Sequence, residues 1–136
     1  MFQIIAAATL LAALPARADD RLIGPSDAWT AAEAGRLQII DIRTPPEYHW
    51  TGSPKTAARA DWWQLAGTSG FLTDILRIVT NDRTRPLALI CARGVRSSKA
   101  TAFLRSHGFT NVRDIGEGML GSRAGPGWLD RKLPLG

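Results

Sequence analysis

The sequence predicts an α/β fold of three layers, in which a mostly parallel β-sheet is flanked by helices on both faces. Short apolar runs that read as buried strands alternate with segments whose apolar residues recur at helical spacing. Strands separated by helices favour a parallel sheet that is covered on both sides. The 136 residues, 45% of them hydrophobic, give room for one hydrophobic core.

The first half of the chain supplies two helices and a strand. Ser26 is the expected N-cap of a helix over residues 27–34, and Gly35 ends this helix. The apolar run 37–42 predicts a buried strand with an acidic residue near its end. A short helix is expected over 46–50, because proline is tolerated in a first helical turn.

The second half of the chain repeats this alternation. Residues 59–66 show no clear periodicity, and their two tryptophans are expected in the core or in the wall of a groove. Helical spacing of apolar residues follows over 71–79, and a second strong strand over 86–90. A helix over 97–106 and a third strand over 111–115 complete the pattern.

The first eighteen residues resemble an export signal. Residues 4–14 are apolar and too short to span a bilayer, and Ala16 and Ala18 are the small residues that signal peptidase requires. We therefore expect residues 1–18 to be a signal peptide, residues 19–136 to be a single domain, and the protein to be exported, in the periplasm. A buried or anchoring helix is the alternative, since no Lys or Arg precedes the apolar run.

The chain carries a formal net charge of +5, but its basic residues are scattered singly. No stripe of Lys and Arg alternates with aromatic residues, which argues against nucleic acid as a partner. A basic surface favours small anionic substrates only weakly.

Cys91 is the only cysteine of the chain. Exported proteins usually pair their cysteines, but a single cysteine forms no internal disulfide, so Cys91 is either a buried leftover or a free reactive thiol. It lies in a tight loop between the strand 86–90 and the helix 97–106. A thiol reacts as its thiolate. Inward-pointing N–H groups of the loop and the positive end of the following helix both stabilise such an anion.

The residues of this loop suit an anionic substrate as well. They are Ala92, Arg93, Gly94, Val95, Arg96 and Ser97. Gly94 permits the backbone conformation that an anion-binding loop needs. Arg93 is the better candidate for a residue that faces the substrate, and Arg96 for an inward or structural role. Asp41 ends another strand, so topology places it on the same rim of the sheet as Cys91.

The loop 91–98 closely resembles the active-site loop of the rhodanese-type sulfurtransferases, C-x-x-G-x-R-S. Residues 41–52 resemble the first signature of that family, D-x-R-x-x-x-E-[YF]-x-x-G. The segments 106–112, 117–121, 127–128 and 133–134 resemble its closing region. The match runs in order over residues 22–135. One departure follows Gly52, where the family usually continues H-I-x-G-A and this chain reads Ser-Pro-Lys-Thr-Ala.

The resemblance implies a rhodanese-like three-layer fold and a double-displacement reaction. Cys91 would take the outer sulfur of thiosulfate or a similar small anionic donor as a persulfide. Cyanide, a thiol or a protein acceptor would then remove it. Asp41 and Arg43 would support the loop, with Arg43 pairing with Glu47 four residues later. A cap at the end of a strand is the alternative role for Asp41.

Two other functions remain open at this stage. A non-catalytic rhodanese-like module that binds a partner or carries a persulfide is the first alternative. A cysteine phosphatase is the second, but phosphatases use C-x5-R. Here four residues separate Cys91 from Arg96, and a shorter loop makes a pocket that suits sulfur better than phosphate.

Neither histidine is a strong candidate for a Cys–His pair. His107 is expected at a helix C-terminus, where the helix dipole favours it, and His49 lies in a segment that the sequence does not place. No cofactor and no metal are expected, because no His, Cys and carboxylate set has the spacing of metal ligands.

Overall fold

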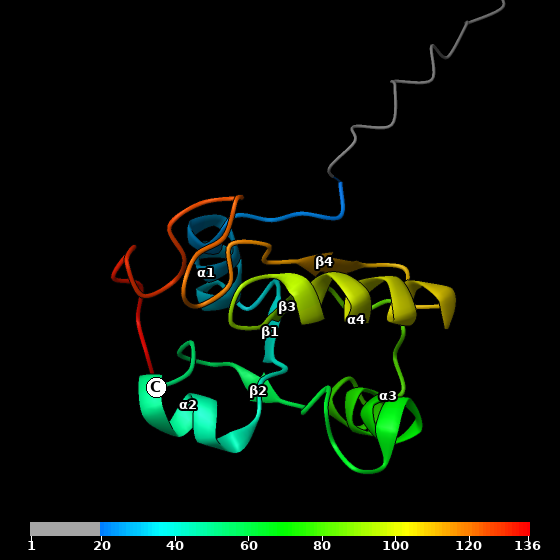
Figure 1. Ribbon diagram of the computed structural model, residues 1–136. Helices are drawn as coiled ribbons and strands as arrows, with labels where there is room; N and C mark the ends of the chain where they lie inside the picture. The colour runs from blue at the N-terminus through cyan, green and yellow to red at the C-terminus, as the bar shows by residue number, and fades with distance from the viewer. Residues whose placement is uncertain (1–19) are drawn as a thin grey trace, which may run out of the picture.

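The computed structural model describes residues 20–136, and the signal peptide expected over residues 1–18 lies outside them. Four parallel strands form one sheet in the order β2-β1-β3-β4 (Figure 1). The strands are β1 (Gln38–Asp41), β2 (Ala58–Arg59), β3 (Leu87–Ile90) and β4 (Val112–Asp114). The helices are α1 (Pro25–Glu33), α2 (Pro45–Thr51), α3 (Gly67–Ile78) and α4 (Val95–Ser106). The predicted α/β fold with helices on both faces is confirmed.

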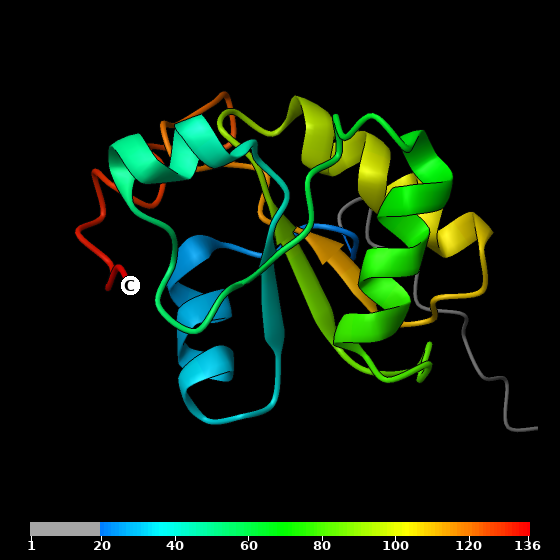
Figure 2. The ribbon, with the colours of Figure 1, turned by 90° about the horizontal axis from the view of Figure 1, so that it is seen from below.

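The sheet is the middle of three layers, with α1 on one face and α3 and α4 on the other (Figure 2). Successive side chains of a strand point to opposite faces. Leu87 and Leu89 of β3 therefore pack toward α3 and α4, whereas Ala88 and Ile90 pack toward α1. Cys91 continues the first set, so its side chain enters the α3–α4 layer at the end of β3.

The carboxyl ends of β1 and β3 lie side by side, because Asp41 pairs in register with Ile90. Helix α2 follows β1 directly and lies across this edge of the sheet (Figure 2). Its start is fixed by a capping box. The Thr44 side chain accepts from the backbone N–H of Glu47, and the Glu47 side chain accepts from the backbone N–H of Thr44. The predicted common rim for Asp41 and Cys91 is thus present in the fold.

Four local details differ from the sequence predictions, and the first is that α3 begins at Gly67 rather than at residue 71. The N-cap of α1 is Gly24 rather than Ser26, because Pro25 already occupies the first helical position. Strand β2 was not predicted, since it has only two residues and one of them is exposed. Helix α4 begins at Val95, two residues before the predicted start, so half of the loop motif is helical. Within the described part of the chain, no helix is long and apolar enough to cross a membrane.

Candidate active site

The Cys91 loop turns its backbone N–H groups toward the sulfur. The N–H of Gly94 donates to Sγ with 3.1 Å between N and Sγ, and the N–H of Ser97 donates at 3.4 Å. The thiol itself donates to the Ser97 hydroxyl oxygen at 3.3 Å. Helix α4 starts at the next residue after Gly94, so its positive end faces the same sulfur. The loop is therefore arranged to stabilise an anion on Sγ.

Two glycines permit this arrangement. Gly94 has φ of +86°, and a Cβ built on it would lie 2.4 Å from the carbonyl oxygen of Gly116. Gly118 has φ of +70°, and its Cβ would lie 2.4 Å from the carbonyl oxygen of Ala92. The segment after β4 thus presses directly against the loop, and any larger residue at either position displaces one from the other.

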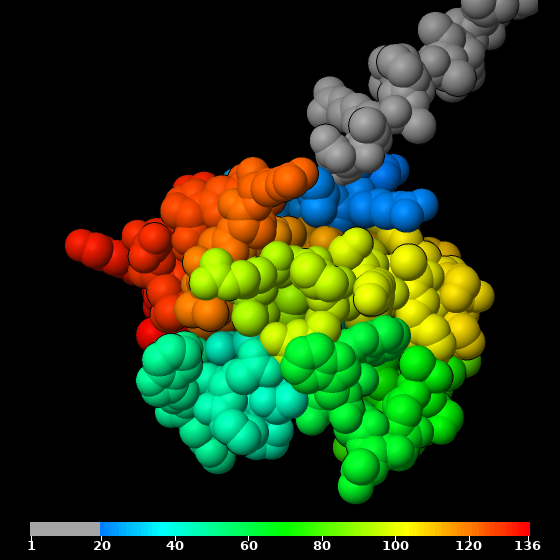
Figure 3. Space-filling model, in the orientation of Figure 1, coloured from blue at the N-terminus to red at the C-terminus, as the bar shows by residue number. Residues whose placement is uncertain are grey.

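The same segment is also hydrogen-bonded to the loop. The N–H of Met119 donates to the Cys91 carbonyl oxygen, and the N–H of Leu120 donates to that of Ala92, both at 2.9 Å. Cys91 is only 1% exposed as a result. The start of α4, in yellow-green, lies between α2, in cyan, and the C-terminal segment, in orange and red (Figure 3).

Arg96 is held by two neighbours of the loop. Its Nη1 and Nη2 each donate to one carboxylate oxygen of Glu47 at 2.7 Å. Its guanidinium also lies over the Trp63 ring, 4.0 Å from the ring centroid. The paired Arg96 guanidinium lowers the pKa of Glu47 to about 2. These contacts support the structural role expected for Arg96.

Arg93 stands in a different environment. It is exposed at the surface of the loop, where its Nη1 donates to the Gly121 carbonyl oxygen at 3.3 Å. Among the two arginines of the loop, Arg93 is the one without a carboxylate in salt-bridge distance within the described residues. Ala92 and Gly94 are partly exposed beside it, and Val95 is exposed.

Asp41 and Arg43 form a buried network below α2. The Arg43 guanidinium donates to both carboxylate oxygens of Asp41, at 2.9 and 2.7 Å, and both residues are at most 1% exposed. Arg43 also donates to the hydroxyl of Thr51 and to the carbonyl oxygen of Gly52. The network thus ties the end of β1 to the end of α2.

The predicted pair between Arg43 and Glu47 is wrong. Glu47 faces outward from α2 toward Arg96, while Arg43 points inward to Asp41. Helical spacing alone did not place them together, because Arg43 precedes the helix, which begins at Pro45.

The sequence predictions did not identify three side chains at this site. The Ser53 hydroxyl donates to the Asp41 carboxylate, with 2.7 Å between Oγ and Oδ2. Ser53 stands where this chain departs from the family pattern. Trp63 covers Arg96, and only the expectation of a groove wall pointed to it. Asp114 at the end of β4 is 5% exposed, and burial raises its pKa to about 6. No sequence motif marks Asp114, because its importance arises from the packing of α4 on β4.

Among residues 20–136, neither histidine forms a hydrogen bond with the Cys91 thiol. His107 caps α4, and its ring bonds to the Phe103 carbonyl oxygen at 2.8 Å, as its predicted place implies. His49 is exposed on α2 and meets the edge of Tyr48. In residues 20–136 no group of three His, Cys, Asp or Glu side chains is arranged to hold a metal ion.

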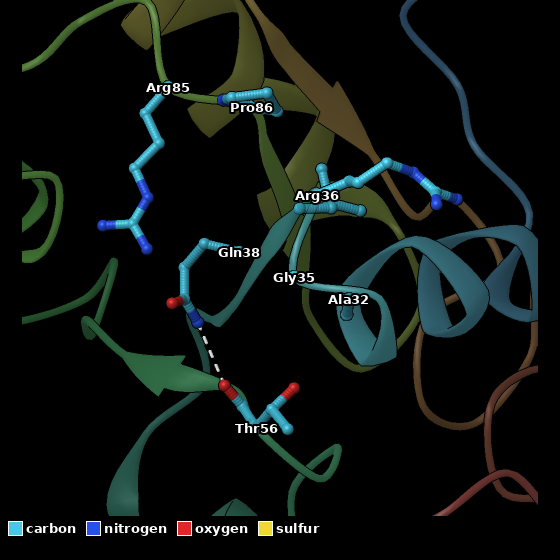
Figure 4. A pocket seen from close by; sticks show the side chains of 8 residues that line it. Ala32, Gly35, Arg36, Gln38, Thr56, Arg85 and Pro86 are labelled. Atoms are coloured by element: carbon cyan, nitrogen blue, oxygen red, sulfur yellow. Dashed lines mark hydrogen bonds between the residues drawn. The ribbon is translucent and has the colours of Figure 1, made fainter.

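A separate cavity of about 160 Å³ lies at the opposite edge of the sheet, beside the amino ends of β1 and β3. Arg36, Gln38, Thr56 and Arg85 are among its lining residues. The two arginines point away from each other, and the Gln38 amide donates to the Thr56 carbonyl oxygen at 3.0 Å (Figure 4). The cavity therefore offers no converging set of charges, in contrast to the Cys91 loop.

Comparison with known proteins gives a family match and similar folds. The family model of the rhodanese-like domain matches residues 24–123. An uncharacterised protein of Rickettsia conorii is 29% identical over 100 residues, which cover 71% of this chain and 80% of its own.

Two solved structures show a similar fold. A protein of M. tuberculosis is 26% identical with a TM-score of 0.61, over 83% of this chain and 94% of its own. The polysulfide-sulfur transferase of Wolinella succinogenes is 23% identical with a TM-score of 0.61, over 84% of this chain and 76% of its own. At that identity the second likeness concerns the fold alone.

Proposed function

Because the chain belongs to the family of rhodanese-like domains, we propose that it is a sulfurtransferase that works through a persulfide on Cys91. The donor is thiosulfate or a similar sulfane-sulfur compound, and the acceptor is cyanide or a thiol. One observation carries the proposal: two backbone N–H groups and the start of α4 converge on the Cys91 sulfur. A merely structural buried thiol needs no such donors.

The reaction has two displacements. In the first, the Cys91 thiolate attacks the outer sulfur of thiosulfate, an S–S bond forms, and the bond to the sulfonate sulfur breaks with release of sulfite. In the second, cyanide or a thiolate attacks the outer sulfur of the persulfide, and Cys91 leaves as a thiolate. The N–H groups of Gly94 and Ser97 stabilise the anion at each stage. Arg93, exposed at the surface of the loop, is the cation available to the incoming anion.

Thiocyanate formation from thiosulfate and cyanide tests the proposal. Wild-type protein should form thiocyanate and gain the mass of one sulfur after thiosulfate alone, whereas Cys91→Ser should do neither. Ser106→Ala, on the far end of α4, is a matched control and should behave as wild type. If the wild-type protein forms no thiocyanate and gains no sulfur, the thiosulfate version of the proposal is wrong.

A non-catalytic rhodanese-like module that binds a partner or carries a persulfide is the second candidate, and the 1% exposure of Cys91 favours its binding role. A substrate must reach a sulfur that the loop and the segment after β4 nearly enclose. Alkylation of the thiol at neutral pH separates the two functions, since a catalytic Cys91 reacts and an inert one supports the module.

We also propose that the protein is exported to the periplasm after cleavage behind Ala18. The support is the composition of the first eighteen residues. The intact mass of the protein from a periplasmic fraction tests this: a first residue of Asp19 is expected, and a mass that includes residues 1–18 contradicts it.

A further inference from the structure

A buried carboxyl group without a charged partner lies on the β4 side of the Cys91 loop. Asp114 is 5% exposed, and its Oδ1 has no hydrogen-bond partner among the described residues. Val112 of the same strand packs toward α3 and α4, so Asp114, two residues later, points to that same face. Unpaired buried carboxyls are rare because their desolvation is costly. The fold therefore keeps Asp114 at a cost that packing alone does not explain.

The charged groups around Asp114 are occupied elsewhere. On α4, Arg96 binds Glu47, and Arg105 donates to the Val112 carbonyl oxygen. After β4, Glu117 binds Arg131. The remaining neighbours are Arg113 and Arg21: Arg113 points to the opposite face of β4, and Arg21 meets Asp114 through its backbone carbonyl. On β3, the titratable group that faces this layer is Cys91.

Ser97 connects the carboxyl group to the sulfur. Its side chain is fully buried on α4, and its hydroxyl oxygen accepts the Cys91 thiol at 3.3 Å. The Ser97 side chain also lies close enough to the Asp114 carboxyl group to oppose the rise in its pKa. One turn along α4, Thr101 is also buried, and its Oγ1 has no partner in the described part of the chain. A thiol, a hydroxyl and a carboxyl group thus form one short buried polar row.

We propose that Asp114 holds the proton of the Cys91 thiol while Cys91 carries sulfur, and that it acts on the sulfur through the Ser97 hydroxyl. The thiol proton passes to the Ser97 oxygen as the S–H bond breaks. The hydroxyl proton of Ser97 passes to Asp114 as a carboxyl O–H bond forms. The products are a thiolate and a neutral carboxyl group, with no change in total charge. The return of the thiolate after the second displacement reverses both steps.

This inference rests on the proposed function for its place in the reaction, but the proton transfer itself needs no sulfur donor. Burial raises the pKa of Asp114 to about 6, although the nearby Ser97 side chain opposes the shift. The group is therefore mostly ionised at neutral pH and ready to accept a proton, yet basic enough to hold one.

The rate of Cys91 alkylation by iodoacetamide as a function of pH tests the proposal. Cys91 is the only thiol, so the intact mass reports its reaction directly. In wild-type protein we expect a step in the rate near pH 6, where Asp114 titrates. Asp114→Asn and Ser97→Ala should both lose this step and react about 100-fold more slowly at pH 7, the lower end of the effect of a positioned proton acceptor.

Asp130→Asn is the matched control, because Asp130 is an exposed carboxylate and the variant removes the same charge. It should follow the wild-type profile. A purely electrostatic role for Asp114 predicts the opposite result, since removal of a buried anion favours a nearby thiolate. An Asp114→Asn variant that keeps the step, or that reacts at pH 7 as fast as or faster than wild type, therefore overturns the proposal.

An NMR titration of wild-type protein keeps the test valid if a variant does not fold. The Cys91 Cβ signal should show a step at the same pH as the Asp114 carboxyl carbon, because coupled groups share their titration steps. A Cys91 signal that shows no step at the Asp114 midpoint overturns the proton transfer. Neither measurement uses thiosulfate. A protein that forms no thiocyanate would therefore contradict the proposed function without deciding the proton transfer.

Discussion

The two sides of the Cys91 loop are built in opposite ways. On the β1 side, each carboxylate has an arginine: Asp41 binds Arg43 and Glu47 binds Arg96, both at 2.7 Å. On the β4 side, Asp114 is buried with a single hydroxyl nearby. Accordingly, the pKa of Glu47 is lowered by its hydrogen bond to Arg96, while the pKa of Asp114 is raised by burial.

The difference separates rigidity from proton exchange. The hydrogen bond to Arg96 keeps Glu47 ionised well below neutral pH, so at neutral pH the ion pairs of the β1 side hold the loop in position. An unpaired buried carboxyl group changes its charge close to neutral pH, which makes the β4 side the one that exchanges a proton. Four predictions test this contrast, each by a change on one side only.

The largest effect is expected for Arg43→Met on the paired side. The variant leaves the Asp41 carboxylate buried without its cation, and breaking a buried pair in this way costs about 3–5 kcal/mol of unfolding free energy. Urea unfolding at pH 7 measures it. Arg77→Met is the matched control, because Arg77 is 72% exposed in its pair with Asp74 and such surface pairs contribute at most about 1 kcal/mol. Equal losses in the two variants would contradict the structural importance of the buried pair.

Asp114→Asn should change the unfolding free energy in the opposite direction and stabilise the protein at neutral pH. The folded pKa of about 6 lies above the ordinary value of 3.8, so between these values the folded state binds more protons than the unfolded state. The stability of wild-type protein therefore falls as pH rises from about 4 to 6. The variant lacks this loss and should be more stable by about 1–3 kcal/mol at pH 7, with no gain at pH 4.

Thermal unfolding across this pH range measures the difference. A constant gap between the wild-type protein and Asp114→Asn at all pH values would contradict it, because the gap would then come from packing rather than from ionisation.

The sequence predicts much of the β1 side of the loop but not the β4 side. The order of strands and helices, the shared rim of Asp41 and Cys91 and the inward place of Arg96 all follow from apolar runs, turn residues and motif spacing. These signals are local, or they follow from the rule that parallel strands end at one edge. Asp41, Arg43 and Glu47 belong to a recognisable signature, although the partner of Arg43 was predicted wrongly.

The other side depends on contacts between segments that no local pattern links. Asp114 ends a strand of three residues, and only the packing of α4 on β4 brings it to Ser97. Ser53 reaches Asp41 where the chain departs from the family pattern. Trp63 lies within a segment without periodicity, and only the fold shows its contact with Arg96. Side chains that act across elements need the assembled fold before their role is visible.

Glu47→Gln tests the paired side from the acid direction. The pKa of Glu47 is lowered from 4.5 to about 2, so its stabilising effect is complete above pH 4.5 and is lost as pH falls toward 2. Because the carboxylate is partly exposed, solvent reduces the expected loss in the variant to about 1 kcal/mol at pH 7. The gap to wild type should close near pH 2, which is the reverse of the behaviour of Asp114→Asn. A gap that widens in acid would contradict this assignment.

The smallest effect is expected for Trp63→Leu, which removes the aromatic face over Arg96 and leaves the ion pair with Glu47 in place. Stacking of this kind contributes about 0.5–1 kcal/mol at an exposed site. Trp50→Leu is the control, because Trp50 is 81% exposed on α2 and should lose less than Trp63→Leu in urea unfolding. In a double-mutant cycle, Trp63→Leu combined with Glu47→Gln should lose less than the two single losses together, because each single variant already loosens the guanidinium that the other neighbour holds. Strict additivity would instead mean that Trp63 and Glu47 stabilise the loop independently, and that the paired side is less cooperative than its geometry implies.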